Sequence, residues 1–156
     1  MLGVIDRRAR DFSEALAPIV KQNNILMLGG SGSHCFPMGG CAMSSRLFGH
    51  FLLIKDEIVT ELVRGVHRDA KTTEHVWLQL GSCIIDLTNC QFDESHTLPA
   101  CPFESPLVSE TEAVVDWYSS YWPESQRSHS NIPETQLTDF DRRLIDEIDT
   151  MIDTTQ

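Results

Sequence analysis

Cys41 has the residue type and the position of a nucleophile. It follows Gly39 and Gly40 directly, and apolar residues after it recur at helical spacing, which predicts a helix that begins at the cysteine. The positive end of a helix dipole favours the thiolate form of such a cysteine. The two glycines allow a sharp turn and leave backbone N–H groups to bind an oxyanion. We therefore predict a reactive thiol, the alternative being a cysteine that only packs at a helix start.

A His–Asp pair is predicted on a β-hairpin further along the chain. Segments 74–80 and 83–88 are joined by Gly-Ser, a two-residue connection that suits a type II′ turn. With this turn, His75 and Asp86 become diagonal neighbours on one face, because side chains alternate along a strand. The imidazole and the carboxylate are then within hydrogen-bonding reach.

The register of this hairpin separates an apolar face from a mixed one. The turn sets Leu80 opposite Cys83, and therefore Trp77 opposite Asp86. We expect the apolar face to be core and the other face to hold the His–Asp pair. The site face carries His75, Trp77, Gln79, Ile84, Asp86 and Thr88, and the apolar face carries Val76, Leu78, Leu80, Cys83, Ile85 and Leu87.

Cys41, His75 and Asp86 together have the residue types of a catalytic triad. An acid beside an imidazole fixes its tautomer and raises its basicity. A thiol at a helix start supplies the nucleophile. We predict that Cys41 attacks the carbonyl carbon of an amide, that His75 takes the thiol proton and later protonates the leaving amine, and that Asp86 orients His75. This chemistry needs no metal and no cofactor.

The same residues resemble the papain-like/transglutaminase-like cysteine superfamily, which has a cysteine at the start of a helix, HxW on one strand and Asp on the next. More closely, FPMGGCAMSSRLFGHFL and HVWLQLGSCIIDLTNCQF are similar to a group of small bacterial proteins with F-P-x-G-x-C and H-x-W…I-I-D-[IL]-T-x-x-Q-F motifs. The resemblance covers about residues 36–92. Gln91 and Phe92 match the motif without an assigned chemical role.

The resemblance implies both a fold and a class of activity. The fold is an α+β domain in which a small antiparallel sheet packs against the helix that starts at Cys41. The implied activity is cysteine-dependent hydrolysis or acyl transfer on an amide, as in a deamidase, a transglutaminase-like enzyme or a peptidase. The alternative is a non-catalytic binding or immunity-type protein that keeps the fold, and it predicts a Cys41 no more reactive than Cys83.

The groups that would contact the substrate are predicted by position alone. Backbone at Gly40 is expected to contribute to the oxyanion site. No papain-type glutamine lies shortly before Cys41, so the second oxyanion donor is expected to be a backbone N–H of the loop over 29–40 or a side chain such as Ser33 or His34. Trp77, next to the His–Asp pair, is expected to pack in the core, the functional alternative being that it walls the substrate site or shields the pair from water.

Two ligand-binding alternatives are weaker. The segment 28–34, LGGSGSH, lacks the Gly-Lys-Ser/Thr ending of a phosphate-binding loop. A zinc site could be drawn from His34, Cys35, Cys41 and His75, but side chains of adjacent residues rarely converge on one ion. We therefore predict neither a nucleotide nor a metal.

Composition limits the partners that this chain can have. Its 156 residues suit one domain, 1–156, and 12 Lys+Arg against 23 Asp+Glu give a net charge of −11. Nucleic acid and anionic membrane both require a basic face, so neither is expected. No apolar run approaches the roughly 20 residues of a membrane span. The expected partners are a protein or small amide substrate and, at a surface, a basic protein or a second copy of the chain.

The cysteines and the N-terminus bear on location. The first residues show no apolar core of a secretory signal, which predicts a cytoplasmic protein while leaving non-classical export of an effector open. The five cysteines include no CxxC pair and are read as free thiols of a reducing compartment, most of them buried: Cys35, Cys41, Cys83, Cys90 and Cys101.

Apolar periodicity predicts the elements that must position the triad. Pro18 is expected to kink or end the first helix early, and Thr138 to cap the last one. The expected elements are a helix over 6–20, a helix from 41 to 52, a strand over 57–66, the hairpin, a loop over 94–106, a helix over 109–122, a polar and mobile segment over 123–136, and a final helix over about 138–153.

Overall fold

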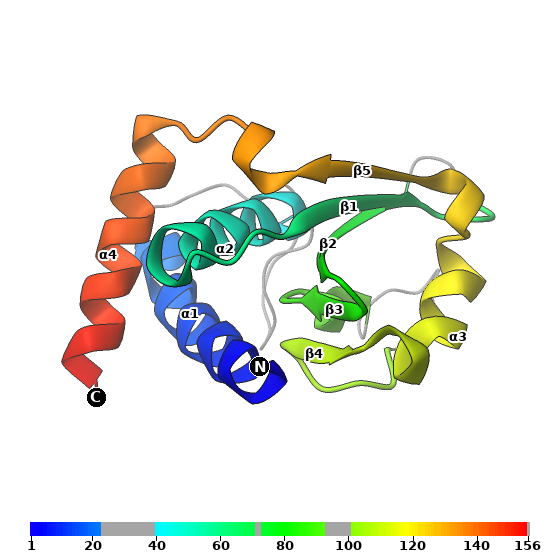
Figure 1. Ribbon diagram of the computed structural model, residues 1–156, viewed down its shortest axis with the longest axis horizontal. Helices are drawn as coiled ribbons and strands as arrows, with labels where there is room; N and C mark the ends of the chain where they lie inside the picture. Colours follow the sequence, from blue (N-terminus) through cyan, green and yellow to red (C-terminus); the bar gives the residue numbers. More distant parts are fainter. Residues whose placement is uncertain (23–39, 71–72, 93–100, 156) are drawn as a thin grey trace.

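The computed structural model describes residues 1–22, 40–70, 73–92 and 101–155 (Figure 1). Within this part, five strands form one antiparallel sheet in the order β4-β3-β2-β1-β5. The prediction of an α+β protein is therefore confirmed. In chain order the elements are α1 (Leu2–Gln22), α2 (Cys41–Asp56), β1 (Glu61–Val66), β2 (Glu74–Leu80), β3 (Cys83–Asp86), a 3-10 turn (Asn89–Phe92), β4 (Leu107–Glu110), α3 (Thr111–Tyr121), a 3-10 turn (Glu124–Gln126), β5 (Arg127–Asn131), a 3-10 turn (Ile132–Glu134) and α4 (Asp139–Thr155).

Helices cover both faces of the sheet. Figure 1 shows α1, α2 and α4 on one side and α3 on the other. On the first side, Leu78 and Ile85 of the hairpin pack against buried residues of α1, α2 and α4. On the second side, Trp77 and Ile84 pack against Tyr118 of α3. The expectation of a single core face is therefore corrected, because α3 also buries the face that carries the His–Asp pair.

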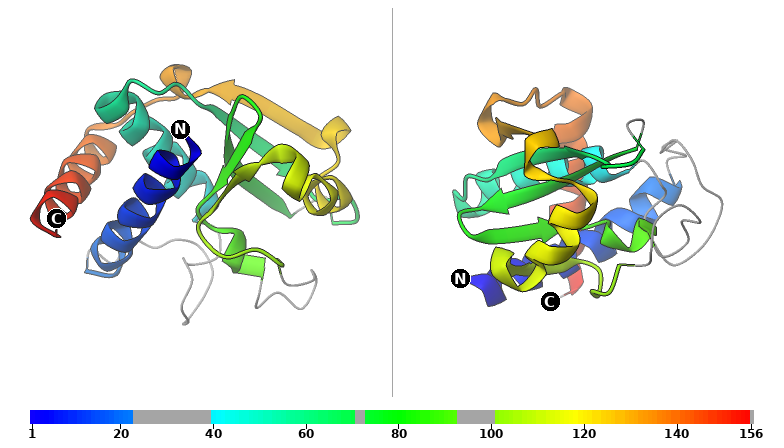
Figure 2. Two further views of the ribbon diagram at one scale, coloured as in Figure 1. Left: turned by 60° about the horizontal axis from the view of Figure 1, so that its bottom comes forward. Right: turned by 90° about the vertical axis from the view of Figure 1, so that its right-hand side faces the viewer.

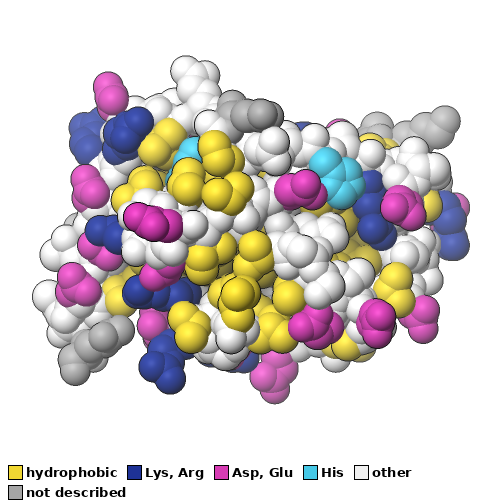
Figure 3. Space-filling view, in the orientation of Figure 1, with side chains coloured by type: hydrophobic (Ala, Val, Ile, Leu, Met, Phe, Trp, Pro, Cys, Tyr) yellow, Lys and Arg dark blue, Asp and Glu magenta, His cyan; other side chains and the backbone are white. Residues whose placement is uncertain are grey.

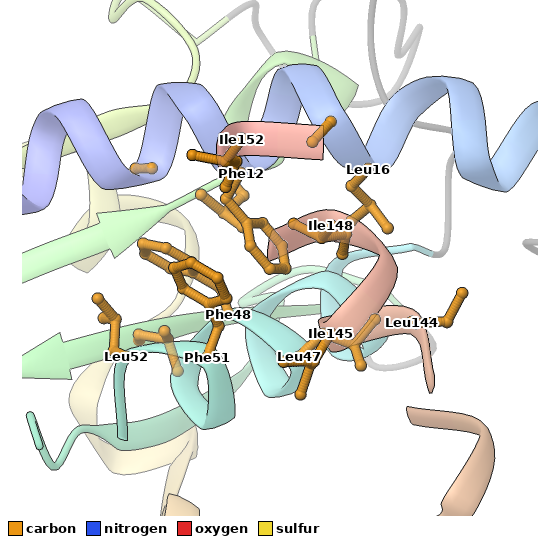
Figure 4. Close-up of a cluster of buried hydrophobic side chains, with 14 of the residues drawn as sticks. Phe12, Leu16, Leu47, Phe48, Phe51, Leu52, Leu144, Ile145, Ile148 and Ile152 are labelled. Carbon is orange, nitrogen blue, oxygen red and sulfur yellow. The ribbon is translucent and has the colours of Figure 1, made fainter. Parts of the chain in front are cut away.

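Three phenylalanine rings hold α1 to α2. The ring centroids of Phe12 and Phe48 are 5.0 Å apart, and those of Phe12 and Phe51 are 5.3 Å apart. Figure 4 shows these rings facing one another, with apolar side chains of α4 beside them. All three rings are fully buried, so each contributes on the order of 1.5–3 kcal/mol of hydrophobic stabilisation. This packing fixes the helix whose first residue is Cys41.

The last helix begins with the predicted cap. The N–H of Asp141 donates to Oγ1 of Thr138 at 3.1 Å, and the N–H of Thr138 donates to Oδ2 of Asp141 at 3.0 Å, so each residue satisfies the other's amide. α4 then runs alongside α1 (Figures 1 and 2) and buries Ile145 and Ile148 in the same core. Its apolar stripe is therefore used within the chain, although Phe140, expected on that stripe, is 44% exposed.

The hairpin has the predicted register. Leu80 pairs with Cys83, and the ladder continues through Gln79–Ile84 and Leu78–Ile85. Gly81 has a φ of 57°, a positive value of the kind that a type II′ turn needs at its first central position. The turn chemistry of Gly-Ser therefore predicted both the connection and the pairing.

Two segments differ from the predictions. α1 continues through Pro18 to Gln22, because the buried side chains of Ile19 and Val20 hold the last turn in the core. The segment expected to be polar and mobile contains β5, which pairs with β1. The β5 side chains are mostly exposed, so no apolar alternation marks the strand, and the sequence gives no local sign of its pairing with β1.

Other boundaries shift by a few residues. The predicted strand over 57–66 begins only at Glu61. The first two residues of the predicted helix over 109–122 belong instead to β4, so that α3 begins at Thr111. A four-residue edge strand is too short to show a period of its own.

The surface carries mixed charge. Figure 3 shows acidic side chains spread over the face in view, with basic side chains among them. Because opposite charges attract, a net charge of −11 favours positively charged partners. A basic protein partner stays a prediction. Among the described helices, none is long and apolar enough to cross a membrane.

Gly65 gives a test of this packing. It pairs with His75 in the β1–β2 ladder, and a Cβ added to it would lie 2.8 Å from Cβ and 2.9 Å from Cγ of Trp122. We expect Gly65→Ala to lower the free energy of unfolding by about 1–3 kcal/mol, because Trp122 must shift. Urea denaturation measures the change, with Gly3→Ala as the control, since nothing lies within 4 Å of a Cβ there. Equal stability of the two variants would contradict the prediction.

Candidate active site

Cys41 is the first residue of α2, as predicted. Gly40 is the N-cap, with φ −77° and ψ −8°, and its carbonyl accepts the first helical hydrogen bond, from the N–H of Ser44, at 2.9 Å. Since glycine has no side chain, the N-cap residue offers no side-chain acceptor to the first-turn amides. The positive end of the α2 dipole therefore lies at the thiol.

The start of α2 is tied to β2 beside His75. Oγ of Ser45 donates to the carbonyl of Val76 at 3.1 Å, and the N–H of Val76 is hydrogen-bonded to the thiol of Cys41. The β2–β3 ladder ends at Leu78 and Ile85, so the backbone polar groups of Val76 lie beyond it. Beyond the end of the ladder, the first turn of α2 supplies the hydrogen-bond partners of β2 that β3 supplies within it. This contact fixes the thiol next to the strand that carries the imidazole.

His75 connects Cys41 to Asp86. Nε2 of His75 lies 2.5 Å from Oδ2 of Asp86, and both side chains are 0% exposed. The thiol of Cys41 is hydrogen-bonded to the side chain of His75. The three residues predicted from the sequence are therefore linked in the order thiol, imidazole, carboxylate.

Asp86 is held by four donors. Oδ2 accepts from His75 and, at 2.6 Å, from the hydroxyl of Tyr118 on α3. Oδ1 accepts from the N–H of Thr88 at 2.9 Å and from its hydroxyl at 3.3 Å. A buried carboxylate needs this many partners to remain charged. The contact of Tyr118 with Asp86 was not predicted from the sequence. The one signal for it is general: a tyrosine on the buried face of a helix needs a partner for its hydroxyl.

The electrostatics of the cluster favour the charged forms. Burial tends to lower the pKa of His75, but the charge and hydrogen bond of Asp86, together with Cys41, raise it from 6.5 to about 9. Burial tends to raise the pKa of Asp86, yet His75, Tyr118 and Thr88 lower it overall. Burial also tends to raise the pKa of Cys41, and the hydrogen bond and charge of His75 lower it overall.

Aromatic rings enclose the imidazole. The ring centroid of His75 lies 5.2 Å from that of Trp122 and 5.7 Å from that of Trp77. Trp77 is 0% exposed, and its ring centroid lies 5.1 Å from that of Tyr118. The guanidinium carbon of Arg127 lies 5.4 Å from the ring centroid of Trp77. This buried position favours the interpretation of Trp77 as a packing residue.

Other predicted site residues are only partly placed. Ser33, His34 and Cys35 lie outside the described residues. Gln91 and Phe92 belong to the 3-10 turn after β3. Within the described ranges, no group of three or more His, Cys, Asp or Glu side chains could hold a metal ion.

Among the cysteines that the structure describes, one differs from the prediction. Cys41, Cys83 and Cys101 are thiols, but Cys90 is disulfide-bonded. The expectation that all five are free thiols is therefore wrong at Cys90. The cysteines no longer support the prediction of a reducing compartment. Burial raises the pKa of the Cys83 thiol, opposite in direction to Cys41.

No family model, curated protein or solved structure matches this chain. Its function has to be inferred from the geometry and the electrostatics of the site.

The pKa shifts define a pH window. The thiolate forms as the pH rises through the lowered pKa of Cys41, and the imidazolium is lost as the pH rises through about 9. We expect His75 to stay protonated through neutral pH, as measured by NMR of histidine-labelled protein, with His75→Gln identifying its signal. A midpoint at the ordinary 6.5 would show that the ion pair does not form.

Proposed function

We propose that this protein is a cysteine enzyme of papain-like or transglutaminase-like type, which transfers the acyl group of an amide through a thioester. The observation that carries the proposal is the buried, hydrogen-bonded series Cys41–His75–Asp86 at the N-terminus of α2. A thiolate, an imidazolium and an orienting carboxylate in this order are the parts that nucleophilic acyl transfer requires.

The proposed reaction has two stages. Sγ of Cys41 bonds to the carbonyl carbon, and the π electrons move to the oxygen, close to the first amides of α2. As the carbonyl reforms, the C–N bond breaks and His75 gives its proton to the leaving amine. Water or an amine then attacks the thioester while His75 accepts its proton, and Cys41 is released as thiolate. Water gives hydrolysis or deamidation, and an amine gives transamidation.

A second candidate is a binding or immunity-type protein that keeps the arrangement without turnover. One observation favours it, namely that Cys41 is 6% exposed and His75 is 0% exposed. On this alternative the polar series would serve to specify the core, and the thiol would be inert.

An activated acyl donor separates the two candidates without knowledge of the natural substrate. We expect an aryl acetate to acetylate Cys41 in a burst that mass spectrometry maps to this residue, and Cys41→Ser to abolish the burst. Cys83→Ser is the matched control and should leave the burst unchanged. Acetylation of Cys41 no faster than that of Cys83 would favour the binding protein.

The same acyl-enzyme distinguishes hydrolysis from transfer. Its decay is followed in water alone and with a small amine added, and the products are counted as acetate or acetamide. Decay that the amine accelerates supports transamidation, while decay independent of the amine supports hydrolysis or deamidation.

A further inference from the structure

Tyr118 contacts the triad, yet the proposed reaction does not use it. Its hydroxyl donates to Oδ2 of Asp86 at 2.6 Å, which is the same oxygen that accepts from Nε2 of His75 at 2.5 Å. Tyr118, Asp86 and His75 are each 0% exposed. Solvent therefore does not compete for this oxygen, and its charge is divided between two protein donors.

Sharing one oxygen has a definite consequence for the imidazolium. Two donors on one acceptor each receive less of its negative charge than a single donor would. A carboxylate bound to His75 alone would hold the proton of the ring more firmly. Proton transfer to a leaving group needs an acid whose pKa is near the working pH, and the pKa of His75 is already raised to about 9. A second donor on Asp86 therefore opposes an excessive hold on the proton.

We propose that Tyr118 is a positioning residue of the triad, which weakens the hold of Asp86 on the His75 imidazolium so that His75 releases its proton to the leaving group. This role rests on the proposed function. It also gives α3 a part in the reaction, because α3 carries the hydroxyl across the sheet face to the carboxylate.

Several elements contribute charge to this cluster. Replacing Tyr118 with Phe removes one neutral hydroxyl and leaves the other titratable groups around Asp86 in place. The substitution therefore changes only the number of donors on Oδ2 of Asp86. The titratable groups that act on Tyr118 or Asp86 are His75 on β2, Cys41 on α2, Cys101 before β4 and Arg127 on β5, with Glu124 acting on Arg127.

The test measures the pH midpoint of His75 by NMR of histidine-labelled protein. In Tyr118→Phe we expect the midpoint to rise by about 0.5–1 pH unit, because Oδ2 of Asp86 then accepts a hydrogen bond from His75 alone. Tyr121→Phe is the matched control: it changes a tyrosine on the same helix whose ring stacks on His67, and it should leave the midpoint unchanged.

A stronger donor should act in the opposite direction. The sequence has two tyrosines, so difluorotyrosine incorporated into Tyr121→Phe protein labels position 118 alone. Its more acidic hydroxyl should lower the midpoint of His75. This protein keeps the hydroxyl and decides the question by itself if Tyr118→Phe does not fold.

The outcomes separate the two proposals. Suppose that the wild-type midpoint is near 9 but does not rise in folded Tyr118→Phe, or does not fall with difluorotyrosine. That result overturns the proposed role of Tyr118 and leaves the proposed function standing. A wild-type midpoint near 6.5 overturns the ion pair on which the proposed function depends. A His75 midpoint that rises in Tyr118→Phe and falls in the difluorotyrosine protein supports both the role of Tyr118 and the ion pair.

Discussion

Replacing His75 with Gln is expected to slow the alkylation of Cys41 by iodoacetamide by about 10- to 100-fold at about pH 6, since each unit of pKa changes the thiolate fraction tenfold. The hydrogen bond and charge of His75 are what lower the pKa of Cys41 against the effect of burial. Without them, burial raises that pKa and the thiolate is lost. Mass spectrometry that resolves each cysteine gives the rate.

His50→Gln is the matched control for this change. His50 is also buried and lies on α2, but its Nε2 contacts Oγ1 of Thr135 at 2.7 Å. We expect the rate at Cys41 to stay at the wild-type value in this variant. If the two variants alkylate at the same rate, His75 does not activate the thiol.

Replacing Asp86 with Ala is expected to lower the free energy of unfolding by about 3–5 kcal/mol, as for other buried charged networks that lose one partner. The substitution leaves the imidazole of His75, the hydroxyl of Tyr118 and the N–H of Thr88 buried without their acceptor. Urea denaturation at neutral pH measures the loss.

Asp141→Ala provides the comparison for Asp86→Ala. Asp141 is also buried, but it accepts from the N–H of Thr138 at the start of α4 and pairs with Arg46, whose side chain is 34% exposed. The loss of such a cap costs about 0.5–2 kcal/mol, and the partly exposed ion pair adds little. Equal losses for the two variants would show that Asp86 is not the centre of a buried charged network.

The hairpin was the part of the site that could be predicted in detail. A Gly-Ser connection admits few turn types, and a turn type fixes the register of the strands that it joins. Once Leu80 is opposite Cys83, alternation places His75 and Asp86 on one face. The position of Cys41 at a helix start followed in the same way from the two glycines and the apolar period after it.

The contacts of Tyr118 and β5 could not be predicted, because no local signal identifies the segment that each of them contacts. The spacing of α3 shows which helix face is apolar, but it does not show that this face lies over Asp86. β5 is made of mostly exposed polar residues, and its backbone pairs with β1. In both cases the determining contact is made with a segment distant in sequence. The disulfide at Cys90 also depends on tertiary contacts, which cysteine spacing alone does not reveal.

The most direct test of an activated Cys41 is the pH profile of alkylation of the wild-type cysteines, with Cys83 as the reference within the same molecule. Cys83 is the more exposed of the two, and burial raises its pKa. We predict that Cys41, although 6% exposed, is labelled first and well below the ordinary thiol pKa of about 8.5. Labelling of Cys83 before Cys41 across this range would contradict the proposed nucleophile.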